Sequence, residues 1–243
     1  MSIPQTQPDR IPDDVRERAG NGQARAVWVN GIGGVTWEIG EGADREYVKH
    51  GPTHPDFDVV AEAARLEWAK RWLPVPTVLA YASTDDESLL ATAALPGESA
   101  VSPRNVTRPE VVVPALGRAL RRFHDALPVA DCPFDWSVSE RLADLGDRRL
   151  VQTPGADLVV CHGDACNPNF LLDEAGECCG YVDLGHLGVS DRHADLAPAI
   201  LSLGWNFGEG WAKAFLSGYG LSVDEERLAF YTWLWEAQPL DDR

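Results

Sequence analysis

Basic residues are scarce in this chain. Of its 243 residues, 21 are Lys or Arg and 38 are Asp or Glu, so the formal net charge is -17. Nucleic-acid backbones and anionic membrane surfaces are bound by an excess of Lys and Arg. The composition therefore argues against nucleic acid or a membrane as the main partner. A field of this sign attracts cationic molecules, although acidity by itself also keeps a protein soluble.

Long apolar runs are missing as well. No stretch approaches the roughly 18 to 20 uninterrupted apolar residues that span a bilayer. Residues 1–18 are rich in Pro, Gln, Asp and Arg and lack the apolar middle of a secretory signal. Hydrophobic residues nevertheless make up 44% of the chain, which is enough for a globular core. We therefore expect a cytoplasmic protein.

Cysteines are few, and their pattern excludes a disulfide framework. An odd count of five with one adjacent pair does not match paired bridges. A zinc site can be drawn from His162, Cys166, Cys178 and Cys179. There is no CxxC motif, however, and the adjacent Cys178 and Cys179 would point to opposite faces of a strand. We interpret the cysteines as small core residues.

The first 95 residues have the pattern of strands around one helix. We expect residues 1–20 to be a loosely packed lead-in, strands over 26–29, 35–39, 45–50, 78–81 and 89–94, and a helix over 58–72. No helix follows the Gly-rich turn at 30–34, so the Rossmann and Walker arrangements are excluded, and the turn alone reads as a hairpin. Leu-Pro-Gly at 95–97 then breaks the chain. We place a lobe boundary there, with lobes of residues 1–95 and 96–243.

One carboxylate in the expected helix needs a partner. Glu62 falls on the apolar stripe that Val59 and Leu66 mark by their spacing. A carboxylate that faces a core costs several kcal/mol unless it is paired. The chain has three lysines, and Lys49 lies alone in the strand before this helix. We predict an ion pair between Lys49 and Glu62; the alternative is that Glu62 reaches water at the edge of the stripe.

Helices dominate after residue 97. A helix is clear over 113–127, and shorter ones are expected over 139–149, 195–203, 210–219 and 223–236. Between them, the strand 158–161 leads into a polar loop that carries Asp164 and Asn169, and Asp183 ends the next apolar stretch. Carboxylate and amide oxygens are ligands suited to Mg²⁺. A carboxylate that holds no metal is free to accept a proton from a hydroxyl. These are the parts that phosphoryl transfer requires.

The order of these residues resembles a known family. His-Gly-Asp at 162–164, Asn169, and Asp-Leu-Gly at 183–185 are similar to the motifs of the aminoglycoside phosphotransferases, relatives of the eukaryotic protein kinases. Tyr-Val-Lys at 47–49, Glu62 and Leu-Pro-Val-Pro at 73–76 resemble the small lobe of that family. Segments 116–128, 132–135, 188–197 and 228–231 are similar to its 3'-phosphotransferase branch. The resemblance covers about residues 26–236.

The resemblance implies an α+β, two-lobed protein-kinase-like fold. Residues 1–95 would form a small antiparallel lobe with one helix that binds nucleotide, and 96–243 a larger, mostly helical lobe for catalysis and substrate binding. Asp164 corresponds to the base or hydroxyl-orienting residue. Asn169 and Asp183 correspond to the Mg²⁺ ligands. Lys49 corresponds to the phosphate-binding lysine and Glu62 to its ion-pair partner.

The same resemblance assigns the remaining nucleotide contacts. Gly33 and Gly34 match the loop over the phosphates, and Tyr47 matches a position that stacks on the base. Ala93 and Ala94 fall where hinge backbone groups meet the base edge.

The chain departs from the family on the acceptor side. The segment between Phe134 and Val159 is shorter than the helical insertion of typical members. His186 stands where the 3'-branch often has Arg. Glu236 alone matches the acidic pair that often ends those enzymes, and it is the candidate substrate residue. Kinase chemistry is therefore better supported than the choice of acceptor.

The expected reaction moves the γ-phosphoryl group of ATP or GTP, with Mg²⁺, to a hydroxyl of a small cationic acceptor, first of all an aminoglycoside antibiotic at its 3'-position. One alternative is a kinase of another small hydroxyl-bearing metabolite or antibiotic. Another is a nucleotide-binding pseudokinase, against which the intact motif residues argue. A protein kinase is disfavoured because the span after Asp183 is short. The nucleotide, the modified hydroxyl, any antibiotic resistance and the oligomeric state stay open.

Overall fold

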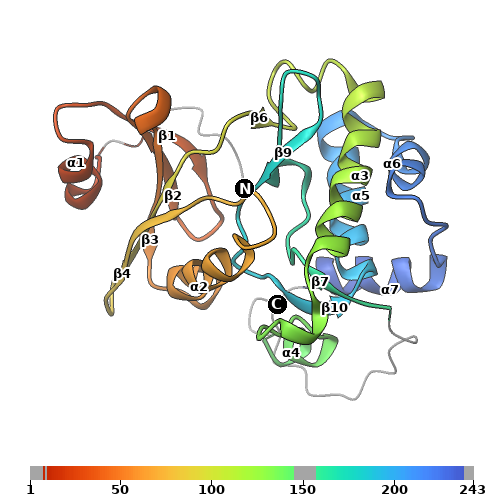
Figure 1. The fold of residues 1–243 in the computed structure, drawn as a ribbon. Helices are drawn as coiled ribbons and strands as arrows, with labels where there is room; N and C mark the ends of the chain where they lie inside the picture. Colours follow the sequence, from red (N-terminus) through yellow and green to blue (C-terminus); the bar gives the residue numbers. More distant parts are fainter. Residues whose placement is uncertain (1–7, 9, 145–156, 238–243) are drawn as a thin grey trace. The chain divides into compact units, whose positions relative to one another are not determined.

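A computed structural model describes residues 8, 10–144 and 157–237. The chain divides into two compact units: unit 1 is Met1–Arg71 with Val75–Leu95, and unit 2 is Trp72–Pro74 with Pro96–Arg243. Unit 1 is an antiparallel sheet with the helices α1 and α2, and unit 2 is mostly helical (Figure 1). The expected α+β class is confirmed.

Unit 1 is built on a five-stranded antiparallel sheet with the order β1-β2-β3-β5-β4. Its elements are α1 (Asp13–Ala19), β1 (Ala24–Val29), β2 (Val35–Ile39), η1 (Gly42–Asp44), β3 (Glu46–Pro52), η2 (Pro55–Phe57), α2 (Val59–Ala69), β4 (Val78–Ser83) and β5 (Glu87–Ala93). The predicted strands are present, with ends that differ by up to two residues. The predicted helix is shorter and ends at Ala69. It begins where expected, since the Asp58 side chain accepts a hydrogen bond from the Ala61 amide at 2.9 Å.

The prediction of a loosely packed lead-in is wrong for residues 13–19. These residues form helix α1, and Val15 is fully buried in a cluster that includes Trp37 and Val48. Arg18 forms an ion pair with Glu46 at 2.6 Å. Hydrophobic periodicity could not predict this helix, because a seven-residue helix with one buried side chain does not repeat its pattern.

Unit 2 contains two small antiparallel sheets, with the orders β10-β7 and β6-β8-β9, and a set of helices (Figure 1). Its elements are β6 (Glu98–Ser99), α3 (Pro109–Ala126), η3 (Val129–Asp131), α4 (Val138–Asp144), β7 (Leu158–Cys161), η4 (Asn167–Asn169), β8 (Phe170–Leu172), β9 (Cys178–Tyr181), β10 (Gly188–Asp191), α5 (His193–Phe207), α6 (Ala212–Tyr219) and α7 (Glu225–Glu236). The predicted helix at 139–149 is present as α4, and its last five residues lie outside the described residues. Strands β6 and β10 were not predicted.

Helix α3 is the centre of unit 2. One of its faces is buried, and the buried side chains include Leu116, Leu120 and Phe123, as the 3-4 spacing predicts. Helix α6 crosses α3 so closely that a Cβ at Gly117 would lie 2.7 Å from the Tyr219 amide nitrogen. A Cβ at Gly218 would lie 3.0 Å from Pro114 Cα. The crossing therefore depends on glycine in both helices.

Two strand pairs hold the polar loop of unit 2 in place. Strand β7, which precedes the loop, pairs with β10, so that Cys161 lies opposite Gly188. Strand β8, which follows the loop, pairs with β9, so that Phe170 lies opposite Tyr181. Both ends of the loop are thus anchored in sheets. Among the described residues, no helix is long and apolar enough to cross a bilayer.

Asp191 joins β10 to α5 through a buried hydrogen-bond cluster. Its side chain accepts from the His193 amide and ring, from the Asp157 amide and from Arg227. Burial acts to raise the pKa of this carboxyl, but the hydrogen bonds from His193 and Asp157 outweigh it, and the pKa is lowered. The charged carboxylate therefore stabilises this junction.

Candidate active site

The predicted ion pair of unit 1 is confirmed. Lys49 Nζ on β3 donates to both carboxylate oxygens of Glu62 on α2, at 2.8 and 2.7 Å. The Glu62 side chain is 9% exposed and that of Lys49 is 21% exposed. A buried carboxylate with a bidentate partner holds that partner in one geometry. The amine of Lys49, in the middle of β3, is therefore held against α2.

The Gly-rich turn between β1 and β2 is closed by Asn30. Its Oδ1 accepts from the amides of Ile32 and Gly34, at 3.2 and 2.6 Å. Gly33 has φ 87°, which favours glycine. Gly34 is close to its neighbours as well, because a Cβ there would lie 2.6 Å from the Asn30 side chain. The turn is thus a tight hairpin whose shape needs both glycines.

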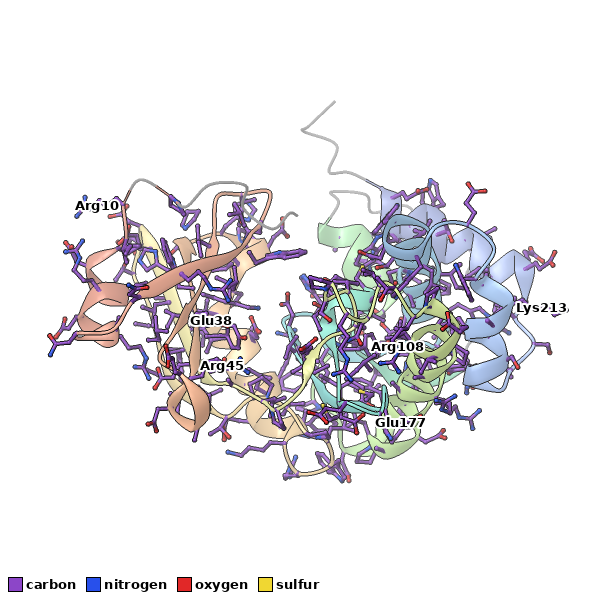
Figure 2. The ribbon with its side chains drawn as sticks, turned by 90° about the horizontal axis from the view of Figure 1, so that it is seen from above. Arg10, Glu38, Arg45, Arg108, Glu177 and Lys213 are labelled. Atoms are coloured by element: carbon purple, nitrogen blue, oxygen red, sulfur yellow. The ribbon has the colours of Figure 1, made fainter. Side chains whose placement is uncertain are left out.

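Tyr47 lies on β3, the central strand of the same sheet. Its hydroxyl donates to Glu38 on β2 at 2.9 Å, and the Arg45 guanidinium lies 5.7 Å from its ring centre; Glu38 and Arg45 are labelled in Figure 2. Burial and the Glu38 hydrogen bond raise the pKa of Tyr47. Burial would also raise the pKa of Glu38, but the hydrogen bonds from Arg25 and Tyr47 outweigh it and lower the pKa. The charged carboxylate of Glu38 therefore holds the ring of Tyr47 in place.

Ala93 and Ala94 at the end of β5 have occupied amides. The Ala93 amide donates to the Thr77 carbonyl and the Ala94 amide to the Arg45 carbonyl, each at 2.9 Å. Amide groups already paired within the sheet are poor donors to a ligand. If Ala93 and Ala94 contact a base edge, their carbonyl oxygens are the backbone groups that can form a hydrogen bond with it.

In unit 2, the loop after β7 buries Asp164. This residue is 8% exposed, and its Oδ1 accepts from the Cys166 amide at 3.3 Å. His162 is fully buried, and its ring accepts from the Asp164 amide through Nδ1 and lies 3.1 Å from the Val182 carbonyl through Nε2. That pattern defines a neutral imidazole with its proton on Nε2. His162 therefore shapes the loop.

Hydrogen bonds through Val182 join the segments that carry the predicted oxygen ligands. The Val182 amide donates to the Asn169 carbonyl at 3.0 Å, while its own carbonyl meets His162. Asp183 is the next residue and has φ 65°, a left-handed conformation that is rare outside glycine. Asn169 Nδ2 donates to the Asp164 carbonyl at 2.9 Å, which leaves the Asn169 amide oxygen for another group. Hydrogen bonds thus join the backbone segments that carry Asp164, Asn169 and Asp183.

The turn after Asp183 packs directly on the loop. A Cβ at Gly163, where φ is 84°, would lie 2.5 Å from the His186 Cβ. The His186 ring stacks on Trp136, with ring centres 4.7 Å apart. The guanidinium of Arg141 lies 5.0 Å from the Trp136 ring. His186 therefore lies beside the loop that carries Asp164, whereas Glu236 is exposed at the end of α7.

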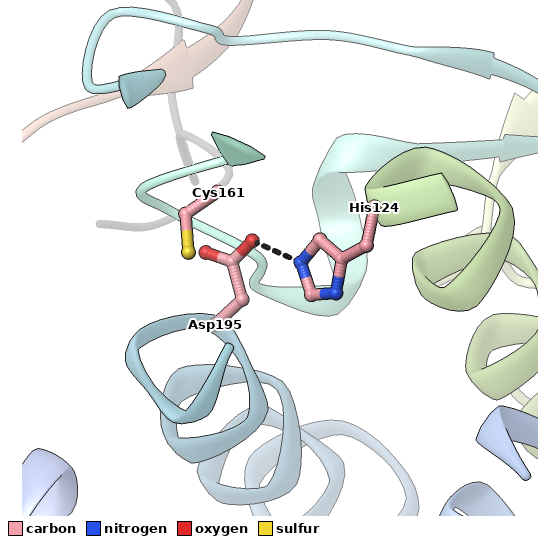
Figure 3. A group of neighbouring side chains, drawn as sticks. All are labelled: His124, Cys161 and Asp195. Carbon is pink, nitrogen blue, oxygen red and sulfur yellow. Dashed lines mark hydrogen bonds and ion pairs between the residues drawn. The ribbon is translucent and has the colours of Figure 1, made fainter. Parts of the chain in front are cut away.

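A buried polar cluster lies beneath the loop (Figure 3). Asp195 on α5 accepts from the amides of His162 and Gly163, at 2.6 and 2.9 Å, so it braces the loop. Its Oδ2 also meets His124 Nε2 of α3 at 2.9 Å. Cys161 completes a group whose potential ligand atoms all lie within 4.8 Å of one another. This group is not the His162 and cysteine set considered above.

Three of the five cysteines are core residues, as predicted, whereas Cys132 and Cys179 are only partly buried. All five are free, and Cys161, Cys166 and Cys178 are buried. Burial raises the pKa of each of these three thiols, well above the usual value for Cys161. Thiolates are the forms that bind zinc, so these thiols are poor candidates for a metal. No disulfide links the described cysteines.

An antiparallel sheet with a Lys–Glu pair, together with a helical unit that carries Asp, Asn and Asp in this order, defines the kinase-like phosphotransferase class. The model of the phosphotransferase enzyme family matches residues 29–152 and 137–231. The chain therefore belongs to this family, and the expected enzyme class is confirmed.

Several relatives and solved structures that are similar to this chain are aminoglycoside phosphotransferases. An aminoglycoside 3'-phosphotransferase of Streptomyces fradiae is 39% identical over 227 residues, covering 77% of this chain and 84% of that protein. The crystal structure of an aminoglycoside 3'-phosphotransferase of type VIII has a TM-score of 0.79 at 29% identity, covering 91% and 95% of the two chains. An aminoglycoside phosphotransferase from Streptomyces rimosus, in complex with ADP and streptomycin, has a TM-score of 0.71 at 26% identity, covering 90% and 94%.

Proposed function

We propose that this chain transfers the γ-phosphoryl group of a nucleoside triphosphate to a hydroxyl of an aminoglycoside, at the 3'-position. The observation that supports the proposal is the set of hydrogen bonds that joins the backbone segments of Asp164, Asn169 and Asp183, through the Asn169 side chain and through Val182. A second support is the kinship with an aminoglycoside 3'-phosphotransferase at 39% identity. Because the structure of the S. rimosus enzyme holds streptomycin, streptomycin is the second candidate acceptor.

Asp164 is the proposed base. Its carboxylate would accept the proton of the acceptor hydroxyl as the oxygen forms a bond to the γ-phosphorus and the bond from phosphorus to the β–γ bridging oxygen breaks. Asp164 is suited to this because its backbone is held on both sides, by His162 at its amide and by Asn169 at its carbonyl. A carboxylate held in one orientation lowers the entropic cost of aligning the hydroxyl.

Asn169 and Asp183 are the proposed ligands of Mg²⁺. The amide nitrogen of Asn169 is occupied by the Asp164 carbonyl, so its oxygen is the atom directed to other partners. An amide oxygen and a carboxylate are hard ligands that fit Mg²⁺ better than the thiols nearby. When bound, the ion would neutralise charge on the phosphates.

The nucleotide side of the proposal rests on unit 1. Lys49, held by Glu62, would contact the phosphates, and the turn with Gly33 and Gly34 would cover them. Tyr47 would stack on the base, and the backbone of Ala93 and Ala94 would meet its edge. ATP and GTP are both candidates for the donor.

The acceptor is proposed to be cationic. A net charge of -17 favours the approach of a polycation and opposes that of an anionic acceptor. Glu236 is the proposed carboxylate contact for an ammonium group. A neutral sugar or an amino alcohol is the alternative acceptor, and a nucleotide-binding pseudokinase is the alternative from another class.

Asp164→Asn tests the proposed chemistry. The amide retains the size of the side chain and an oxygen for the Cys166 amide, but it accepts no proton. We expect kcat to fall by about 10²–10⁴-fold, while the affinity for nucleotide changes little. Asp125→Asn, an exposed change in the same unit, is the control and should leave kcat unchanged. Full activity of Asp164→Asn would refute the role of Asp164.

An acceptor panel tests the substrate class. Kanamycin-like aminoglycosides, streptomycin, a neutral sugar and a cationic amino alcohol are each offered with ATP and with GTP, and phosphate transfer is measured. Transfer to the aminoglycosides alone supports the proposal. Transfer to another acceptor would support the alternative kinase, and nucleotide binding without any transfer would support the pseudokinase.

A further inference from the structure

We propose that His124 and Tyr219 are positioning residues for phosphoryl transfer, which act through Asp195 on the backbone that carries Asp164. The inference rests on the proposed function and extends it to two residues that make no contact with the proposed reacting groups. His124 lies on α3, Asp195 on α5 and Tyr219 on α6. All three belong to unit 2.

The first step is the hold of Asp195 on the loop. Its carboxylate is fully buried and accepts from two consecutive backbone amides, of His162 and Gly163. Asp164 follows directly. A hydrogen bond to a buried carboxylate is worth more than one between neutral groups. The position of the Asp195 carboxylate therefore fixes the position of the Asp164 backbone.

The second step is the hold of His124 on Asp195. His124 Nε2 lies 2.9 Å from Asp195 Oδ2, and His124 Nδ1 lies 2.8 Å from the Tyr219 hydroxyl (Figure 3 shows the first of these contacts). A carboxylate only accepts, so Nε2 carries the proton. In a neutral ring Nδ1 is then an acceptor, and Tyr219 is the donor.

The third step is the hydrogen bond between Arg192 and Tyr219, at the end of the series farthest from Asp195. Arg192 Nη1 donates to the Tyr219 oxygen at 3.1 Å, which leaves the hydroxyl proton for His124. Burial raises the pKa of Tyr219 to about 12, so the phenol keeps that proton at neutral pH. Every donor in the series from Arg192 to Asp195 thus points toward the carboxylate, and each bond polarises the next in the same sense.

Tyr219 is placed by the close crossing of α3 and α6. The glycines at this crossing, Gly117 and Gly218, allow the two backbones to approach. Gly218 directly precedes Tyr219, and Gly117 lies two helical turns before His124. The hydroxyl therefore reaches the ring because the helices are in backbone contact, and a change at the crossing would be transmitted to the loop.

The same cluster is a poor metal site. Cys161 Sγ donates to the Asp191 carbonyl at 3.4 Å, and both carboxylate oxygens of Asp195 already accept from backbone amides. A metal would need the thiolate and would compete with the amides that hold the loop. We call the series of hydrogen bonds from Arg192 through Tyr219 and His124 to Asp195 the hydrogen-bond relay. It gives the polar atoms of His124 and Asp195 their partners without a bound ion.

Four variants of the full chain test the inference. His124→Leu removes the donor to Asp195, and His124→Gln keeps an amide donor near the place of Nε2. Tyr219→Phe removes one hydroxyl. Tyr231→Phe is the matched control, because Tyr231 is also a buried tyrosine of unit 2 but has no hydrogen bond to this relay.

The readouts are steady-state kinetics and hydrogen exchange at the His162 and Gly163 amides. We expect kcat to fall about 30–100-fold in His124→Leu and about 3–10-fold in Tyr219→Phe, with KM for both substrates within about twofold. His124→Gln should recover most of the loss, and Tyr231→Phe should keep kcat. Exchange at the two amides should accelerate in the order of the kinetic losses.

A merely structural role predicts another pattern. It would lower the melting temperature of the Phe variants alike, would not be rescued by Gln, and would leave kcat of the folded enzyme intact; that result would overturn the inference. If the wild-type chain transferred phosphate to no acceptor, the proposed function would fail, but the amide exchange would still decide the inference. Unchanged exchange in His124→Leu would refute it, and so would stoichiometric zinc in the purified protein.

Discussion

Replacing Gly218 by Ala is expected to destabilise unit 2, although Ala is the better helix former. The added Cβ would lie well inside van der Waals contact with the Pro114 carbonyl oxygen and 3.0 Å from the Pro114 carbonyl carbon and Cα. Backbone atoms of α3 cannot rotate away as a side chain would. The two helices must therefore separate, against carbon contacts that rest near about 3.5–4.0 Å.

The magnitude follows from two opposing terms. Overpacking of this kind costs about 1–3 kcal/mol, and sometimes more. Ala gains about 1 kcal/mol over Gly inside a helix. We expect a net loss of about 1 kcal/mol, and at most about 2 kcal/mol, in the free energy of unfolding, which lowers Tm by about 2–4 °C per kcal/mol in a chain of this size.

Gly204→Ala on α5 isolates the steric term. A Cβ at Gly204 meets no atom within 4 Å, and the residue is an exposed position inside the helix. The propensity gain is the same, so this variant should gain about 0.5–1 kcal/mol. Calorimetry and urea denaturation of both variants, beside the wild type, measure the difference. The two substitutions should shift Tm in opposite directions.

A Gly218→Ala variant as stable as Gly204→Ala would refute the close crossing of α3 and α6. The same variant carries a kinetic consequence, since Tyr219 follows Gly218. Its kcat, measured well below the new Tm, should fall while that of Gly204→Ala stays unchanged.

Three further outcomes are expected. Glu62→Gln leaves the lysine of β3 without its charged partner and should raise KM for the nucleotide about tenfold; an unchanged KM would count against the role of the pair. Val15→Ala should lower the free energy of unfolding by about 1.5–3 kcal/mol in urea titrations, whereas Glu17→Ala, exposed on the same helix, should not. Asp191→Asn should be less stable than the wild type at neutral pH. Because hydrogen bonds such as those from His193 lower the pKa of Asp191 below its ordinary 3.8, that difference should shrink as the pH falls through and below this value, and a gap independent of pH would contradict the cause.

The sequence predicted the chemistry-bearing residues better than their surroundings. A carboxylate on an apolar stripe required a cation, and with three lysines in the chain the choice of Lys49 for Glu62 followed. The 3-4 spacing of α3 was sufficient to predict its buried face, because an 18-residue helix repeats its pattern several times. Short elements gave no such repeat. Helix α1 and strand β10 are held by contacts with distant residues.

The relay beneath the loop had no local signal at all. Asp195 and His124 are 71 residues apart, and Tyr219 is 95 residues from His124. A histidine near the end of an amphipathic helix looks like any other partly polar position until its neighbours are known. Similarly, the pairing of the Ala93 and Ala94 amides depends on Thr77 and Arg45, which the strand pattern alone does not identify.

By itself, the sequence determined the types and order of the reactive groups: a strand lysine, a helix glutamate, and Asp, Asn and Asp on two neighbouring loops. These follow from residue identity and spacing, which are local properties of the chain. The tertiary structure alone decided which donors each carboxylate meets and how closely the helices approach. Burial and hydrogen-bond direction arise only when segments far apart in sequence are packed together, so Asp195, His124 and Tyr219 could not be joined before the fold was known.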